Sequence, residues 1–167
     1  MKIYKPIAHK LVKRKTSPDW ISHLPYIGVA SNWGISVRQF SHAYSDVYGF
    51  YDSNIRTIWL YSMSPRIFLH ELAHVADDRN YTLSSSAPPE TFLNPEIMRN
   101  YIHDEVVAEW SATSLLQFGG LSPRSSGRGN SQIYVQELCE MGGMDWEHTI
   151  ADCSPRINMV IKTIQGG

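Results

Sequence analysis

The chain has 167 residues, 43% of them apolar and 19% charged, which excludes a disordered chain and suits one domain with its own core. Its net charge of −1 excludes a global field that attracts nucleic acid or anionic membranes. The sequence shows no secretory signal or membrane-spanning run, and it has only two cysteines, Cys139 and Cys153. A cytoplasmic protein without a membrane partner is therefore expected.

The first segment of the chain is basic. Six Lys and Arg residues precede the first acidic residue, Asp19. Residues 1–15 alternate these cations with Ile, Val and Leu, which predicts an edge strand or a mobile arm. Such an arm would favour a nucleic acid or an acidic partner, and the alternative is a solvated segment that pairs loosely with the acidic remainder. Ser17-Pro18 then predicts the start of a helix that Pro25 and Gly28 keep short.

The segment that follows has strand character. Ile35 and Val37 alternate with polar residues, which is typical of a half-buried strand. Two aromatic and β-branched runs, 47–51 and 55–61, flank the short turn sequence Asp52-Ser53-Asn54. This arrangement predicts a β-hairpin.

The remainder of the chain has helical periodicity. Helices are expected over about 65–79, 95–118 and 131–141, and Ser154-Pro155 marks a last one. Ser-Pro or Asn-Pro pairs signal the start of three of these helices, and Gly-Gly pairs end the second and third. The Ser- and Pro-rich stretch 84–89 is a predicted loop, and 121–130 is a predicted flexible surface loop.

The first of these helices contains the sequence His70-Glu71-Leu72-Ala73-His74. Residues four apart lie on one helix face, so His70 and His74 direct two imidazoles toward a common point, as a tetrahedral Zn²⁺ requires. Glu71 is adjacent to the first histidine. It is expected to hold the reacting water as general base and to pass the proton to the leaving amine.

The second long helix supplies a pair of carboxylates, Glu105 and Glu109, which also lie four residues apart. The residues between them are apolar, and burying two carboxylates without a cation is costly. We therefore expect one zinc per chain, with Glu105 as third ligand and Glu109 orienting a zinc-bound histidine through its other ring nitrogen. The alternative is that both glutamates lie on a solvated helix face.

Two acids close the first helix, Asp77 and Asp78. Asp77 lies three residues after His74, from where it could orient a ligand imidazole or accept a hydrogen bond from a neighbouring loop. The alternative is that both acids cap or solvate the helix end. That position opposes the helix dipole, which argues for a specific partner for at least one of them.

The pattern His70-Glu71-xx-His74 followed by Glu105-xxx-Glu109 resembles the gluzincin metallopeptidases. The strings HELAHVADD and EVVAEWSA are similar to the lethal-factor type of catalytic domain. The helix EVVAEWSATSLL is also similar to the zincin-like domain of antirestriction proteins. The resemblance covers about residues 47–118, and its two motifs are specific for the superfamily rather than for one family.

The resemblance implies an α+β, zincin-like single domain over 1–167. A small twisted sheet with an edge strand would lie over the HExxH helix, followed by a helical C-terminal part. The strand Ile55–Tyr61 would be the edge to which an extended peptide adds, with Thr57, Trp59 and Tyr61 binding substrate. Zincins often stabilise the tetrahedral intermediate with a Tyr or His. Tyr101 is our first candidate for this catalytic role, ahead of His103, Tyr134 and His148, and a core or surface role is the alternative for each.

The expected function is hydrolysis of peptide bonds in a peptide or protein substrate by a zinc metallopeptidase. The alternative is a zincin-fold binding protein without catalysis, in which the metal site regulates a protein or nucleic-acid partner. A coincidental HExxH sequence is a third interpretation. Substrate preference and oligomeric state have no signal in the sequence.

Overall fold

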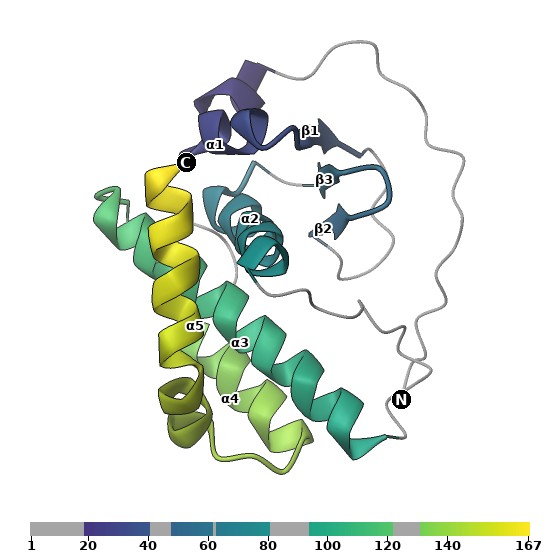
Figure 1. Cartoon of the computed structure of the whole chain (residues 1–167), viewed down its shortest axis with the longest axis vertical. Helices are drawn as coiled ribbons and strands as arrows, with labels where there is room; N and C mark the ends of the chain where they lie inside the picture. Colours follow the sequence, from purple (N-terminus) through teal and green to yellow (C-terminus); the bar gives the residue numbers. More distant parts are fainter. Residues whose placement is uncertain (1–18, 41–47, 62, 81–93, 122–130) are drawn as a thin grey trace.

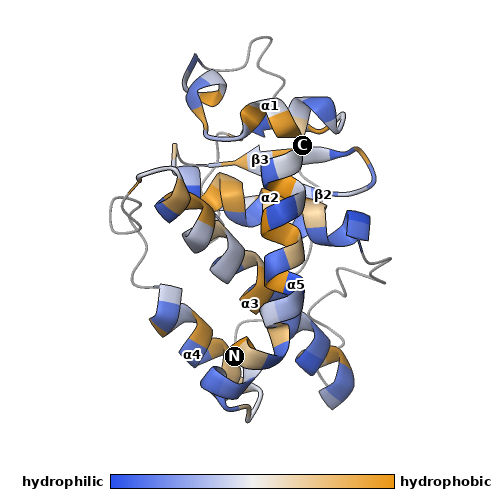
Figure 2. Ribbon diagram, turned by 60° about the vertical axis from the view of Figure 1, so that its left-hand side comes forward, coloured by the Kyte–Doolittle hydropathy of each residue, from blue (hydrophilic) through white to orange (hydrophobic). Residues whose placement is uncertain are grey.

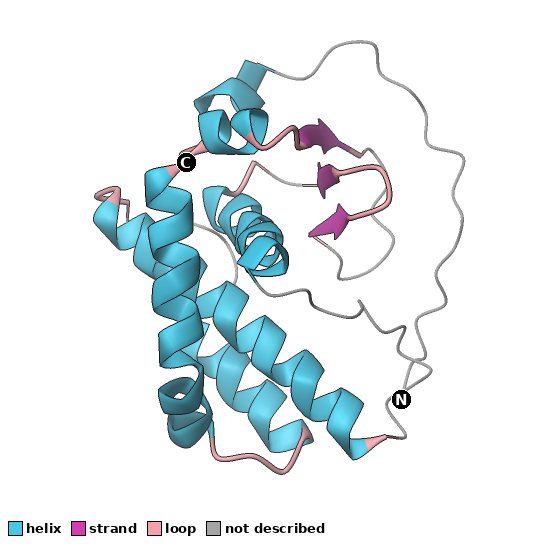
Figure 3. Cartoon of the chain, viewed as in Figure 1, coloured by secondary structure: helices cyan, strands magenta, loops and turns pink. Residues whose placement is uncertain are grey.

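Helices and a small sheet make up the part of the chain that the computed structural model describes, residues 19–40, 48–61, 63–80, 94–121 and 131–167. The strands gather on one side, and the long helices form the rest of the molecule (Figures 1 and 3). The expected α+β class is confirmed. The basic segment 1–15 and the predicted loop 84–89 lie outside the described residues, as does nearly all of the predicted loop 121–130.

Among the described residues the sheet has three strands, β1 (Ser36–Gln39), β2 (Gly49–Asp52) and β3 (Thr57–Leu60). β2 and β3 are antiparallel, with Phe50 opposite Trp59, and they form the predicted hairpin. In its turn the Asp52 carboxylate accepts a hydrogen bond from the backbone N–H of Asn54 at 3.0 Å. β1 is parallel to β3, and its alternating burial confirms the predicted half-buried strand.

The strand order is β1-β3-β2, so β3 is the central strand. The prediction that Ile55–Tyr61 forms the edge of the sheet is wrong. Consequently Thr57 and Trp59, which are buried, and Tyr61, which follows the strand, cannot receive a substrate strand by edge pairing. The hairpin sequence determines only the neighbour on one side of β3. The neighbour on the other side is a parallel strand from earlier in the chain, which requires a long connection that local sequence does not reveal.

Two short helical segments precede the sheet. The first, η1 (Asp19–His23), is the short helix expected after Ser17-Pro18. The second, α1 (Ile27–Asn32), was not expected, because Pro25 and Gly28 read as breakers. Pro25 instead precedes the helix, where its missing N–H has no consequence. Gly28 lies within α1, and a Cβ added there would meet no atom within 4 Å.

The two helices that carry the predicted metal ligands are α2 (Pro65–Asn80) and α3 (Pro95–Phe118), which agree closely with the expected ranges. Asn94 caps α3 by accepting the N–H of Glu96 at 2.9 Å. One side of α2 contacts the sheet and another side packs on α3 (Figure 1). The helices carry both apolar and polar stretches in Figure 2, as helices with one buried face do.

The C-terminal part consists of α4 (Ser131–Met141), as predicted, and α5 (Trp146–Gly166). α5 begins well before the predicted Ser154-Pro155 start, at Asp145, whose side chain caps the helix by accepting the N–H of His148 at 2.7 Å. Pro155 therefore lies inside the helix. Pro155 is exposed to solvent, so the backbone carbonyl one turn earlier, which receives no hydrogen bond from the proline, can bond to water. None of the described helices is long and apolar enough to cross a membrane.

Arg156 ties α5 to both metal-site helices. Its Nε donates to Asp77 Oδ1 of α2 at 2.8 Å, while its Nη2 contacts the other oxygen of Asp77 and also Asp104 of α3. Asp77 is only 1% exposed. A carboxylate buried this deeply needs a partner, because removing one member of a buried ion pair leaves an uncompensated charge.

We expect Arg156→Met to lower the free energy of unfolding by about 3–5 kcal/mol, because it leaves Asp77 buried without its cation. Denaturant titration of the purified variant measures this change. Arg99→Met in α3 is the matched control, since Arg99 is exposed and its loss is expected to cost less than about 0.5 kcal/mol. Equal effects of the two substitutions would show that the Arg156 bridge does not stabilise the fold.

Candidate metal centre

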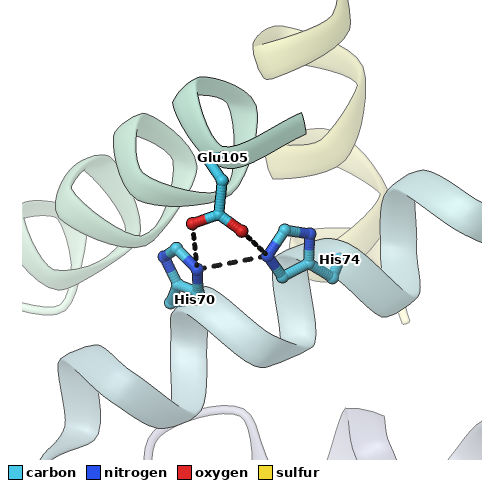
Figure 4. Close-up of side chains that lie close together, drawn as sticks. All are labelled: His70, His74 and Glu105. Carbon is cyan, nitrogen blue, oxygen red and sulfur yellow. Dashed lines mark hydrogen bonds and ion pairs between the residues drawn. The ribbon is translucent and has the colours of Figure 1, made fainter. Parts of the chain in front are cut away.

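Three side chains from α2 and α3 converge on one point (Figure 4). The Nε2 atoms of His70 and His74 are 3.1 Å apart. Glu105 spans both rings, with Oε2 at 3.5 Å from His70 Nε2 and Oε1 at 3.5 Å from His74 Nε2. The structure thus brings together the three residues that the sequence predicted as ligands, and all three are half-buried.

These separations suit a single small metal ion. In a tetrahedral site with bonds of about 2.05 Å, neighbouring ligand atoms lie roughly 3.3 Å apart. The two Nε2 atoms are 3.1 Å apart and each lies 3.5 Å from a different oxygen of Glu105, so the carboxylate is within reach of a metal ion held between the two rings. Two imidazole nitrogens and one carboxylate oxygen are also a donor set that Zn²⁺ accepts. Within the described residues, this is the group of His, Cys, Asp and Glu side chains with the spacing of a metal site. The residues present therefore fit a bound zinc.

Glu109 holds the other nitrogen of His70. Its Oε2 lies 3.2 Å from His70 Nδ1. Because a carboxylate only accepts hydrogen bonds, this contact places the ring proton on Nδ1 and leaves the Nε2 lone pair directed at the common point. This is the position that the sequence predicted for Glu109.

Arg66, one turn before His70 on α2, holds Glu109 in turn. Its Nε donates to Glu109 Oε1 at 2.9 Å and its Nη2 contacts the same oxygen, with both side chains 5% exposed. Burial opposes ionisation of Glu109, but His70, Arg66 and a hydrogen bond with Ser131 lower its pKa to about 2. Glu109 is therefore an anion at any physiological pH.

The surroundings of His70 favour its protonated form. Burial disfavours a charged His70, yet hydrogen bonds with Glu105 and Glu109 raise its pKa well above the ordinary value. Burial likewise opposes a charged Glu105, but the two histidines lower the pKa of this carboxyl well below its usual range. The carboxylates of Glu105 and Glu109 thus favour the protonated form of His70 when no metal ion supplies a positive charge.

We expect zinc affinity to rise with pH, because a metal ion must displace this proton from His70. Below the raised pKa of His70 the association constant should increase about tenfold per pH unit, and above that pKa it should level off. Calorimetric titrations in buffers of different ionisation enthalpy should detect about one released proton per zinc at pH 7. An affinity that does not change between pH 6 and pH 7 would contradict this account of the cluster.

Glu71 lies beside the cluster with 8% of its surface exposed. Its carboxylate accepts a hydrogen bond from the backbone N–H of Tyr51 in β2, so the sheet and the helix meet at this residue. Burial raises the pKa of Glu71, although His70, His74 and the Tyr51 N–H act in the opposite direction. A buried carboxylate with a raised pKa is a better proton acceptor than a solvated one, which suits a general base.

Two tyrosines adjoin the cluster. The Tyr134 hydroxyl, from α4, donates to Glu105 Oε2 at 2.8 Å. Tyr101 is near enough for the carboxylates of Glu105 and Glu71 to raise its pKa, in addition to the effect of burial. Burial and Glu105 likewise raise the pKa of Tyr134, so both phenols stay protonated and can donate hydrogen bonds.

The other predicted candidates have different surroundings. The side chain of His148 is 77% exposed, pairs with Asp152 at 3.4 Å and is not among the converging donors. Burial and Arg156 lower the pKa of His103. The structure places Asp77 against Arg156 rather than against a ligand imidazole, so its contact runs to a neighbouring helix.

No protein-family model matches this chain, and comparisons with curated proteins and with solved structures also gave no match. The gluzincin resemblance therefore depends only on the sequence of the hairpin and of helices α2 and α3, within residues 47–118. A zincin-like fold and activity stay proposals.

Two arginines that pair with buried carboxylates were not found from the sequence, Arg66 and Arg156. Arg66 had a usable signal, because it precedes His70 by four residues and so shares its helix face. Arg156 had none, because its partners lie on two other helices and far away in the chain. Tyr134 was one of several candidates, and only its contact with Glu105 separates it from them.

Proposed function

We propose that this protein is a zinc-dependent peptidase with a zincin-like site, which hydrolyses peptide bonds with water. The observation that carries the proposal is the combination of three donor atoms spaced for one metal ion with a buried Glu71 on the same helix. His70, His74 and Glu105 would hold the metal. A bound zinc would supply Lewis acidity, which polarises a peptide carbonyl and lowers the pKa of water toward about 7.

Three protein donors favour a catalytic rather than a structural site. Structural zinc sites are closed by four protein ligands, whereas catalytic sites keep one position open. The part of the chain that the structure describes offers three ligands at this point. This supports a position for water or substrate next to Glu71.

Glu71 would act as general base. Its carboxylate would take a proton from the attacking water and pass it to the leaving amine. The Tyr51 N–H holds one end of this carboxylate against β2, so the group is oriented before substrate arrives. The raised pKa supports the first step, because a stronger base takes a proton from water more readily, and it keeps the carboxyl group protonated until the proton passes to the leaving amine.

Tyr134 is the best-placed residue to stabilise negative charge on the substrate oxygen. Its hydroxyl already lies at the cluster, on Glu105, and a protonated phenol can redirect its hydrogen bond as charge develops on a carbonyl oxygen. Tyr101, the residue favoured from sequence, is the second candidate. A Tyr134→Phe variant tests this role when its turnover is compared at saturating zinc, because the lost hydroxyl also contacts the proposed ligand Glu105.

The outer edge of β2 is the place where an extended substrate would bind. Tyr61 N–H donates to Tyr48 C=O at 2.9 Å, and because pairing alternates along antiparallel strands, the backbone groups of Gly49 and Tyr51 point away from β3. Among the described strands none pairs with this edge. Tyr51 already contacts Glu71 there, so a peptide added to β2 would pass beside the general base.

The experiment that tests the function combines metal analysis with cleavage of a proteome-derived peptide library. The zinc-loaded protein should hold about one zinc per chain and generate new peptide termini, detected by mass spectrometry. A zinc-loaded Glu71→Gln variant is the matched control and should generate none. Stoichiometric zinc binding without any cleavage would refute the peptidase and favour a regulatory metal-binding protein.

A further inference from the structure

We propose that Arg66 is a positioning residue that reserves Glu109 for His70 and so leaves Glu105 as the carboxylate that binds the metal. This inference builds on the metal centre of the proposed function. Two glutamates one helical turn apart both reach the same histidine, so the fold has to determine which of them binds the metal.

The two glutamates approach His70 from opposite sides of its ring. Glu105 Oε2 lies 3.5 Å from Nε2, and Glu109 Oε2 lies 3.2 Å from Nδ1. Both nitrogens can bind a metal ion and both carboxylates are suitable ligands. Sequence spacing alone does not show which of the two glutamates binds the metal, so another group has to distinguish them.

Arg66 makes that distinction by binding Glu109 through its second oxygen. The guanidinium contacts Oε1 through both Nε and Nη2, while Oε2 faces His70, so each oxygen of Glu109 has a partner. Each oxygen of Glu105 instead faces the Nε2 atom of one histidine, at 3.5 Å in both cases. Glu105 is thus the carboxylate directed at the metal position.

The placement of Arg66 follows from the helix itself. Arg66, His70 and His74 occupy successive turns of one face of α2. On α3, Arg66 and His70 contact Glu109, and His74 contacts Glu105, which lies one turn earlier. Arg66 also balances the negative charge of Glu109, one of the carboxylates beside the histidines. Without it, Glu109 would be a buried anion whose charge only His70 balances, with Ser131 as a neutral hydrogen-bond partner.

A double-mutant cycle on zinc affinity tests the inference. Arg66→Met and Glu109→Gln should each weaken zinc binding by about tenfold or more, the usual cost of losing a partner of a metal ligand. In the Glu109→Gln background Arg66→Met should have little further effect, because Arg66 acts through Glu109. Arg66→Lys should recover part of the affinity, since an ammonium keeps the charge but lacks the fork. Affinities are measured by competition with a zinc chelator.

Several outcomes would overturn the inference. Wild-type affinity in Arg66→Met, or losses that simply add in the double variant, would show that Arg66 does not act through Glu109. If Arg66→Met does not fold, the cycle is run with Arg66→Lys, which keeps a cation beside Glu109 and should weaken zinc binding only while Glu109 is present. Arg99→Met is the control for a surface arginine.

The same measurements separate this inference from the proposed function. A wild-type protein that binds zinc and shows the expected cycle, yet cleaves no peptide, would retain the role of Arg66 and refute the peptidase. A wild-type protein that does not bind zinc would refute both.

Discussion

Glu71→Gln is expected to retain zinc and to lose about a thousandfold or more of the peptidase turnover, which is within the range that general acid–base groups contribute. Glutamine has the shape of glutamate, and its side-chain oxygen can still accept the Tyr51 N–H, so the site should keep its structure. Its amide, however, cannot take a proton from water. Turnover of a peptide identified in the library screen, together with zinc content, measures both properties.

The comparison is informative because Glu71 is not among the three converging donors. A loss of zinc in Glu71→Gln would mean that Glu71 is a ligand rather than a base. Retained turnover in a zinc-loaded variant would contradict the mechanism outright. Asp78→Asn, at an exposed acid near the end of α2, is a suitable control and should change neither property.

His74→Ala is expected to lose both zinc and activity. His74 contributes one of the three donors, and its Nε2 lies 3.1 Å from that of His70 and 3.5 Å from Glu105. A zinc site with four ligands is worth about 10–16 kcal/mol, so removal of one ligand should weaken binding by roughly a thousandfold. Chelator competition measures the affinity, and the same preparation is assayed for turnover.

A matched control is available in His148, which is exposed and is not among the converging donors. His148→Ala should leave zinc affinity unchanged. If His74→Ala bound zinc as tightly as the wild type, the convergence of His70, His74 and Glu105 would have no role in metal binding. Zinc should be retained in Glu71→Gln and lost in His74→Ala, and this difference distinguishes the base from the ligands.

The two arginines join the helices that form the candidate site. Arg66 joins α2 to α3 on one side of the histidines, and Arg156 joins both helices to α5 on the other side. Each arginine contacts a carboxylate that is almost fully buried. Metal ligands on two separate helices keep a common point only if the helices cannot slide, and these ion pairs oppose such sliding.

The local features of this protein follow from its sequence. The hairpin, α2, α3 and α4 have signals within their own residues, namely turn residues, caps and apolar periodicity. Spacing within a helix likewise places His70 with His74 and Glu105 with Glu109, because residues four apart always share a helix face. Helix spacing therefore predicted the two pairs, whereas the approach of Glu105 to the histidines depends on how α2 packs on α3.

Only the tertiary structure decided the features that depend on partners far apart in the chain. The central position of β3 results from its pairing with β1, a parallel strand that precedes the hairpin in the chain. The contacts of Arg66, Arg156 and Tyr134 cross between helices. No residue pattern within one helix specifies which side chains of another will face it, because that depends on how the helices pack.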